Sequence, residues 1–281
     1  MERIEFRVGD VALVADASGP SEGQPVLFLH GGGQTRQSWG NAVNEAAARG
    51  FRAYAIDLRG HGESGWSLDG RYGLNRFAED VRAVATRMDQ APVLVGASLG
   101  GIASLLVAAS PPPEIAGLVL VDIAVRLDTE GAREIQSFMA SAPGGFASLD
   151  EAADAVAAYL PHRPRPRDTS GLMRNLRPRS DGRLYWHWDP AFMTVPAGTF
   201  VDTAALDAAA RALKVPTLLV RGARSRVLTA QDARHFLELA PHAGFVDVAG
   251  ADHMVAGDAN DAFNTAIFTF LAQLPAPEIT R

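Results

Sequence analysis

The sequence has no cysteine among its 281 residues. This absence excludes disulfide bonds, thiolate metal sites and cysteine nucleophiles together. Lysine is almost absent as well, since Lys214 is the only one. It lies just before the Val215-Pro216 that leads into a predicted strand, outside any apolar pocket that the sequence identifies. We therefore expect neither cysteine chemistry nor a lysine Schiff base.

Long hydrophobic runs are also missing. The longest ones, such as residues 115–121, are far too short to span a bilayer, and residues 1–6 alternate like a strand and lack the apolar segment of a signal peptide. We therefore expect a cytoplasmic protein without a membrane partner. The net charge of -6 argues against a nucleic-acid partner. A chain of this length suits one large α/β domain with an insertion.

The stretch 92–101 points most directly to chemistry. A short β-branched run precedes Ser98, and apolar residues at helical spacing follow it until Pro111. Ser98 is therefore predicted to lie on a turn from a strand to a helix, with Gly96 and Gly100 two positions before and after it. This context favours a nucleophile elbow over an ordinary Ser-Gly turn, because such a turn strains the backbone and exposes the serine hydroxyl.

Two other loops have the composition that a nucleophilic serine needs. The apolar strand 25–29 runs into His30-Gly31-Gly32-Gly33, whose glycines leave backbone amides free to stabilise an oxyanion. A phosphate loop is the less favoured interpretation, because neither G-K-[ST] nor G-x-G-x-x-G spacing is present. Late in the chain, His253 follows the predicted strand 245–248, which is where a general base for Ser98 is expected.

The loop after the predicted strand 51–56 carries Asp57, Arg59 and His61. A carboxylate and a guanidinium two residues apart at a strand end usually hold a loop together. We therefore predict a structural role for this loop rather than a direct catalytic one.

Strand and helix patterns alternate along most of the chain and predict a parallel sheet wrapped by helices. Residues 126–204 interrupt this alternation, because no buried-strand pattern occurs in them. We predict a core of residues 1–125 and 205–281, and a cap of residues 126–204 over the carboxyl edge of the sheet, where ligands bind in such folds.

Four aromatic residues are predicted to contact the substrate in this arrangement: Trp39, Trp186, Trp188 and Phe192. The last three lie in the predicted cap. They suit an apolar acyl pocket and the cap's own core equally well, and the sequence does not separate these two interpretations.

Taken together, four motifs resemble the capped α/β-hydrolase family, in its serine esterase and lactonase-like branch. The resemblance covers nearly the whole chain and rests on the glycines of 30–33, the D-x-R-G-x-G-x-S of 57–64, the elbow 96–100 and the G-x-x-H of 250–253. It implies an α/β-hydrolase fold, in which a mostly parallel eight-stranded sheet is flanked by helices and carries a helical cap insertion.

The resemblance also implies roles at the site. Ser98 would be the nucleophile, His253 the general base, and the amides of Gly32 and Leu99 the oxyanion hole. Epoxide hydrolases and haloalkane dehalogenases of this fold are excluded, since they need an aspartate where Ser98 stands. We expect no metal and no cofactor.

The third member of the triad is where the sequence departs from the family pattern. The family most often has its acid just after the strand that here ends at Arg221, but residues 222–226 contain no carboxylate. Asp122, at the end of the strand after the elbow helix, is the position that some members use, and it keeps the order serine, acid, histidine. We predict Asp122 as the acid, the alternative being a triad without one.

These features predict a serine hydrolase that acts on a small carboxylic ester, lactone or thioester with an apolar portion, through an acyl-enzyme at Ser98. Two alternatives stay open, because a fold does not by itself set a function. One is C–C bond hydrolysis or cofactor-free oxygen chemistry on the same fold, and the other is a relative that binds a ligand without turnover. A homodimer is compatible with the sequence, which does not fix the oligomeric state.

Overall fold

The computed structural model describes residues 1–126, 129–159, 165, 167–194, 202–225, 227–249 and 260–275. An eight-stranded sheet lies at its centre, in the order β1-β2-β4-β3-β5-β6-β9-β10. The first two strands form an antiparallel hairpin, β2 is antiparallel to β4, and the remaining neighbours pair in parallel. The predicted mostly parallel eight-stranded sheet is therefore confirmed. Its strands are β1 (Glu2–Val8), β2 (Val11–Ser18), β3 (Pro25–Leu29), β4 (Arg52–Ile56), β5 (Val93–Ala97), β6 (Gly117–Val121), β9 (Thr217–Gly222) and β10 (Gly244–Val248).

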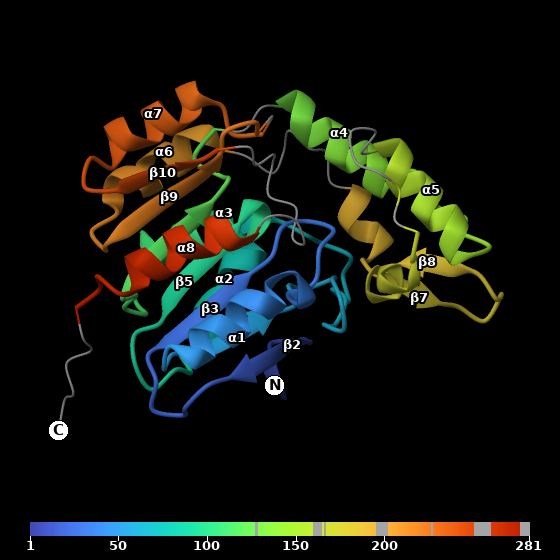
Figure 1. Ribbon diagram of the computed structural model, residues 1–281, viewed down its shortest axis with the longest axis horizontal. Coiled ribbons are helices and arrows are strands. Elements are labelled where there is room, and N and C mark those ends of the chain that lie inside the picture. Colours follow the sequence, from blue (N-terminus) through green and yellow to red (C-terminus); the bar gives the residue numbers. More distant parts are fainter. Residues whose placement is uncertain are drawn as a thin grey trace.

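Helices cover both faces of this sheet (Figure 1). Strands β3, β5 and β6 are buried along their whole length for that reason, which explains their uninterrupted apolar sequences. On one face of the sheet lie α1 (Gly40–Ala48), which follows the 3-10 helix η1 (Arg36–Trp39), and α8 (Asn260–Leu271). On the other face lie α2 (Leu74–Ala85), α3 (Ser98–Ala108), α6 (Thr203–Ala212) and α7 (Ala230–Leu239).

No helix in the described part of the chain is long and apolar enough to cross a membrane.

Helix α7 shows how local sequence sets an element. It begins after Thr229, whose side chain accepts from the backbone of Asp232 while the Asp232 carboxylate accepts from the backbone of Thr229. This is the capping box that the spacing of the two residues indicates. Asp232 is therefore used by the helix start.

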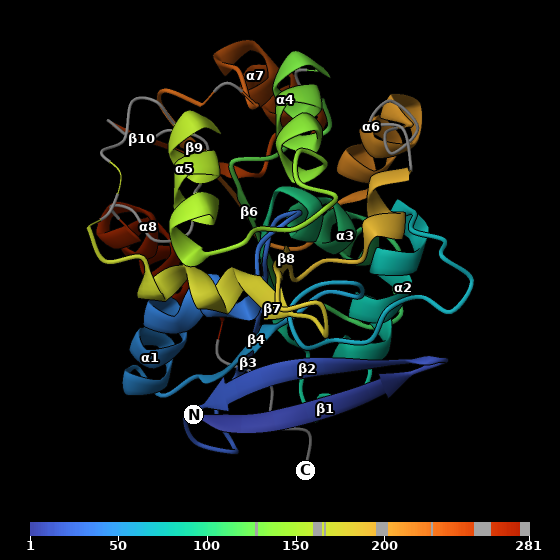
Figure 2. The ribbon, with the colours of Figure 1, turned by 90° about the vertical axis from the view of Figure 1, so that its right-hand side faces the viewer.

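Between β6 and α6 the chain leaves the sheet and forms a separate layer beside it, which we call the cap (Figure 1); Figure 2 looks onto this layer, with the core behind it. Its side chains contact the loops that follow β3 and β4, so it covers the carboxyl edge of the sheet. The cap consists of α4 (Thr129–Met139), α5 (Leu149–Tyr159), η2 (Ser170–Asn175), β7 (Leu176–Pro178), β8 (Leu184–Trp186) and η3 (Pro190–Thr194).

The cap contains a hairpin of β7 and β8, whose strands are only partly buried and so are not buried strands of the kind that the sequence lacks in residues 126–204. Each strand has only three residues, and each buries a single one, Leu176 and Trp186. Such short strands lack the continuous apolar run by which a buried strand is recognised. The predicted end of the cap at residue 204 falls inside α6, which packs against α3 and α7.

Candidate active site

Ser98 stands at the turn between β5 and α3 in a strained conformation. Its φ is 46°, in the left-handed region that non-glycine residues rarely adopt. Glycines allow the chain to close around it. A Cβ on Gly96 would lie 2.5 Å from the carbonyl oxygen of Gly100, and a Cβ on Gly100 would lie 2.5 Å from that of Leu29. Both glycines are therefore required by close backbone contacts.

A tight turn of residues 31–34, which we call the glycine turn, lies against the serine. The N–H of Gln34 donates to the carbonyl oxygen of Gly31 at 3.1 Å, and Gly33 has a φ of 74°. This positive φ favours glycine at the third position of the turn. A Cβ on Gly31 would lie 3.2 Å from Ser98 Cβ, so the turn passes directly beside the side chain of the serine.

The two predicted oxyanion donors belong to these two segments. Gly32 lies in the glycine turn, and Leu99 follows Ser98 in the first turn of α3. The first amides of a helix have no acceptor within it, and the helix dipole adds positive potential there. The chain thus brings both predicted donors next to Ser98, although they are 67 positions apart in sequence.

Asp122 lies at the end of β6 and is completely buried. Its φ of 53° is the other left-handed value among the described non-glycine residues. Its N–H donates to the carbonyl oxygen of Val220 at 2.7 Å, and its Oδ1 accepts from the N–H of Gly222 at 3.0 Å. The strained backbone thus holds a carboxylate between the ends of β6 and β9, at the same edge of the sheet as Ser98. The predicted general base, His253, lies outside the described residues.

The loop after β9, where the family usually has its acid, is organised by an arginine. Arg221 Nη1 donates to both carboxylate oxygens of Asp247, at 3.0 and 2.9 Å. Its other nitrogens donate to the carbonyl oxygens of Leu228 at 2.9 Å and Ala223 at 3.0 Å. Asp247 is therefore bound to Arg221, whereas the Asp122 carboxylate accepts from the backbone N–H of Gly222.

The charged residues that follow β4 hold their loop, as the sequence predicts. Asp57 is completely buried and accepts from the backbone N–H of Arg36 at 2.6 Å and from its guanidinium. Arg59 Nε donates to Asp80 Oδ2 at 2.6 Å, and both side chains are buried. These ion pairs explain the charges of the loop without a catalytic role.

Three buried histidines lie side by side next to the glycine turn. The ring centroids of His30 and His61 are 5.3 Å apart, and those of His61 and His187 are 5.9 Å apart. Burial lowers the pKa of His30 to about 4 and that of His61 to about 3, and it lowers the pKa of His187 well below 6.5. All three rings are therefore neutral at pH 7. In the described part of the chain, no group of histidines and carboxylates is arranged to hold a metal.

Two side chains of the cap cover the glycine turn. A Cβ on Gly32 would lie 3.8 Å from the ring of Phe192, and a Cβ on Gly33 would lie 3.1 Å from the sulfur of Met139. Phe192 is therefore the predicted aromatic residue that the structure brings to the site. Met139 at the end of α4 is a neighbour that the sequence did not single out, because a helical apolar pattern does not show what the helix will cover.

The three tryptophans that were also predicted to contact the substrate pack against other aromatic rings. Trp186 stacks on Trp188 with a centroid distance of 5.0 Å and packs against Phe146, inside the cap. Trp39 packs against Phe28 at 5.3 Å, in the core cluster on the face of α1 and α8. The contacts that the structure gives for these tryptophans are therefore with other aromatic side chains, whereas Phe192 contacts the glycine turn.

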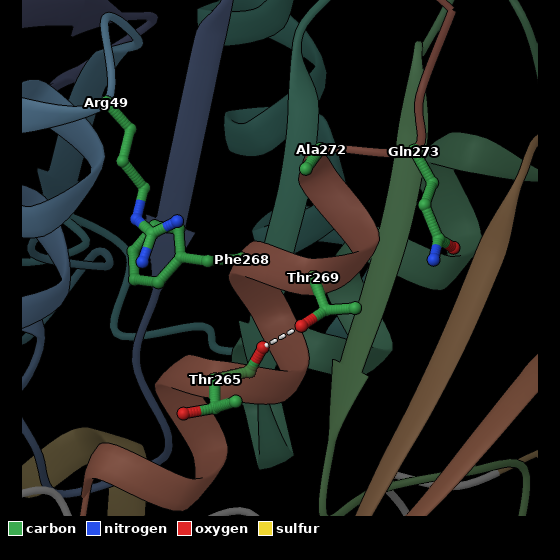
Figure 3. A pocket seen from close by; sticks show the side chains of 6 residues that line it. All are labelled: Arg49, Thr265, Phe268, Thr269, Ala272 and Gln273. Atoms are coloured by element: carbon green, nitrogen blue, oxygen red, sulfur yellow. Dashed lines mark hydrogen bonds between the residues drawn. The ribbon is translucent and has the colours of Figure 1, made fainter.

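A shallow hollow lies elsewhere, on the face of the sheet that α1 and α8 cover (Figure 3). The guanidinium of Arg49 lies over the ring of Phe268, 4.8 Å from its centroid. Thr269 Oγ1 donates to the carbonyl oxygen of Thr265 at 2.7 Å. The residues that line this hollow carry no carboxylate, imidazole or serine hydroxyl.

Comparisons with known proteins agree with this architecture. A family model described as alpha/beta hydrolase fold matches residues 24–259. Esterase Rv0045c of Mycobacterium tuberculosis is 34% identical over 223 residues, which are 77% of this chain and 72% of that protein. The crystal structure of E-2-(acetamidomethylene)succinate hydrolase has a TM-score of 0.83 at 26% identity, and the match covers 96% of this chain and 100% of the other. The enol-lactonase from Burkholderia xenovorans shares the fold, with a TM-score of 0.75 at 22% identity over 96% of this chain and 100% of its own.

Proposed function

We propose that this chain, which belongs to the α/β-hydrolase fold family, is a serine hydrolase. It would cleave a small carboxylic ester, lactone or thioester through an acyl-enzyme at Ser98. The observation that carries the proposal is the strained turn at Ser98, with the glycine turn directly against the side chain of the serine. Strain of this kind is typical of a nucleophile elbow. The similarity to a mycobacterial esterase supports an ester as the bond that is cleaved.

The proposed reaction begins with a proton transfer. A neutral His253 takes the proton from Ser98 Oγ, and the oxygen attacks the carbonyl carbon of the substrate. The amides of Gly32 and Leu99 donate to the oxyanion that forms. The leaving alcohol or thiol receives the proton from His253, and water activated by the same histidine then hydrolyses the acyl-enzyme.

Asp122 has the role of the triad acid in this proposal. Its buried carboxylate accepts one hydrogen bond from Gly222, which holds it in place at the edge of the sheet. A carboxylate there fixes the tautomer of the histidine and stabilises its charged form during the reaction. Asp247 is bound to Arg221 and serves the loop after β9.

The cap side chains suggest the character of the substrate. Phe192 and Met139 are buried and lie over Gly32 and Gly33, next to the reacting centre. They favour a short apolar acyl portion, because a long one would have to displace side chains that are already packed.

The test is labelling with a fluorophosphonate probe, followed by mass spectrometry, on the wild type, Asp122→Asn and Asp247→Asn. We expect the wild type to be labelled at Ser98, Asp122→Asn to be labelled much more slowly, and Asp247→Asn to be labelled at close to the wild-type rate. A folded wild type that is not labelled would contradict the proposal. Slow labelling of Asp247→Asn instead of Asp122→Asn would contradict the assignment of the acid.

A further inference from the structure

His187 joins the cap to the glycine turn. It follows β8 and is only 2% exposed. Its Nδ1 accepts from the N–H of Gly62 at 2.7 Å, and its Nε2 lies 3.3 Å from the carbonyl oxygen of Gly33. Because Nδ1 accepts, the proton of the neutral ring is on Nε2, which therefore donates to Gly33. One side chain of the cap thus holds both the loop after β4 and the glycine turn after β3.

The chain on either side of this contact is fixed to the core as well. The N–H of Asp189 donates to the carbonyl oxygen of Gly60 at 2.8 Å. The hydroxyl of Tyr72 donates to Asp189 Oδ2 at 2.6 Å, and both residues are buried. Further along, Phe192 reaches Gly32. The segment 187–192 is therefore anchored at several points, which fixes where the imidazole of His187 stands.

The glycine turn needs contacts from outside it that fix its backbone conformation. Three consecutive glycines give its backbone a wide choice of conformations, and an amide serves as an oxyanion donor only while it points at the oxyanion. Within the turn, Gln34 supplies two hydrogen bonds, both to Gly31. The bond from His187 reaches the other end of the turn, at Gly33.

We infer that His187 is a positioning residue for the oxyanion hole, through which the docked cap fixes the orientation of the glycine turn. The catalytic consequence of this inference rests on the proposed function, in which the amide of Gly32 donates to the oxyanion. The physical contact does not, since it consists of hydrogen bonds between the cap and the core.

Two substitutions separate the two contacts of the imidazole. The amide oxygen of His187→Asn can take the place of Nδ1 and accept from Gly62, but this side chain is too short to donate to Gly33. The longer amide of His187→Gln reaches the position of Nε2 and keeps the donor to Gly33 while the acceptor for Gly62 is lost. As a matched control, His235→Asn alters a half-buried histidine that pairs with Asp207 between α6 and α7.

We expect His187→Asn to lower kcat about 10- to 100-fold with a KM close to that of the wild type, because a displaced oxyanion donor acts on the transition state. His187→Gln should stay within about threefold of the wild-type kcat by the same reasoning. Inhibition by a trifluoromethyl ketone, which forms an oxyanion on Ser98, should weaken in His187→Asn by the same factor as kcat. A merely structural role would instead affect both variants alike, and this outcome would overturn the inference.

Amide hydrogen exchange tests the same contact without turnover. His187→Asn should speed exchange at residues 32–34 more than at Gly62, and His187→Gln should do the reverse. If these shifts appear while the wild type is not labelled at Ser98, the proposed function is wrong and the coupling of cap and turn is supported. If exchange at residues 32–34 is the same in His187→Asn and the wild type, the inference is wrong, whatever the enzyme does.

Discussion

The turn at Ser98 and the cap segment 187–192 lie next to each other but are held by different forces. Around Ser98 the backbone is packed so closely that a Cβ on Gly96 or Gly100 would meet a carbonyl oxygen at 2.5 Å. The segment 187–192 is held by separate hydrogen bonds: those of the side chains of His187 and Asp189, and one from the backbone N–H of Asp189. We conclude that the first region tolerates no added atom, whereas the second can be loosened one bond at a time.

The largest effect is expected at the nucleophile itself. Ser98→Ala should lower kcat about 10⁴-fold or more, since the hydroxyl is needed for the acyl-enzyme. Rates on an ester substrate give the measurement, and Ser110→Ala, an exposed serine after α3, is the control that should leave kcat unchanged. A loss of less than tenfold in Ser98→Ala would reject the nucleophile and favour the C–C hydrolase or oxygenase alternatives.

The next effect tests the close packing of the elbow. Gly100→Ala brings a methyl group against the carbonyl oxygens of Leu29 and His30 and should lower the free energy of unfolding by about 3 kcal/mol. Gly40→Ala is the matched control, because its added Cβ meets nothing within 4 Å and its φ of -54° is helical. That variant should be neutral or more stable by about 0.5–1 kcal/mol in urea unfolding. Equal stability of the two variants would contradict the packing argument.

Acid should lower the free energy of unfolding through the buried histidines that lie where cap and core meet. His30 and His187 are neutral when folded because burial lowers their pKa, to about 4 for His30 and well below 6.5 for His187. The unfolded chain binds a proton at each from about pH 6.5 downward, whereas the folded chain does not. Stability is therefore lost as the pH falls from 6.5 towards 4, by about 1.4 kcal/mol per pH unit for each such histidine.

Urea unfolding at several pH values checks this slope. His187→Gln has no imidazole at this position, so its stability should fall less steeply between pH 6.5 and 4 than that of the wild type. His235→Asn changes a histidine that is not fully buried and is the control. The same slope in His187→Gln and the wild type would show that His187 does not titrate with unfolding.

The smallest effect is expected from one anchor of the cap segment. Tyr72→Phe removes the hydroxyl that donates to Asp189 and should cost about 1–2 kcal/mol, because a buried carboxylate oxygen loses a partner. Tyr185→Phe removes a bond from an exposed pair with Asp181 and should change the free energy of unfolding by less than about 0.5 kcal/mol. Thermal unfolding compares the two, and a larger loss in Tyr185→Phe would contradict the anchor.

Sequence patterns predicted the sheet, the capping box of α7 and the elbow with its two glycines. These features depend on residues close together in the chain, so periodicity and spacing contain the necessary information. The hairpin of β7 and β8 escaped the prediction because its strands are short and half exposed. Trp39 and Phe192 are both aromatic, yet Trp39 packs in the core under α1 and Phe192 packs in the cap beside the glycine turn, in two different core clusters.

By itself, the sequence determined the fold class, the turn that presents Ser98 and the loop that supplies three glycines beside it. It did so because the sterics of strands, turns and helix starts act over a few residues. Only the tertiary structure decided that Asp247 is bound by Arg221, that Phe192 rather than Trp186 reaches the glycine turn, and that His187 bridges cap and core. The contacts of His187 join residues 125 and 154 positions apart. No local pattern determines such pairs, since they form only once the cap has docked on the carboxyl edge of the sheet.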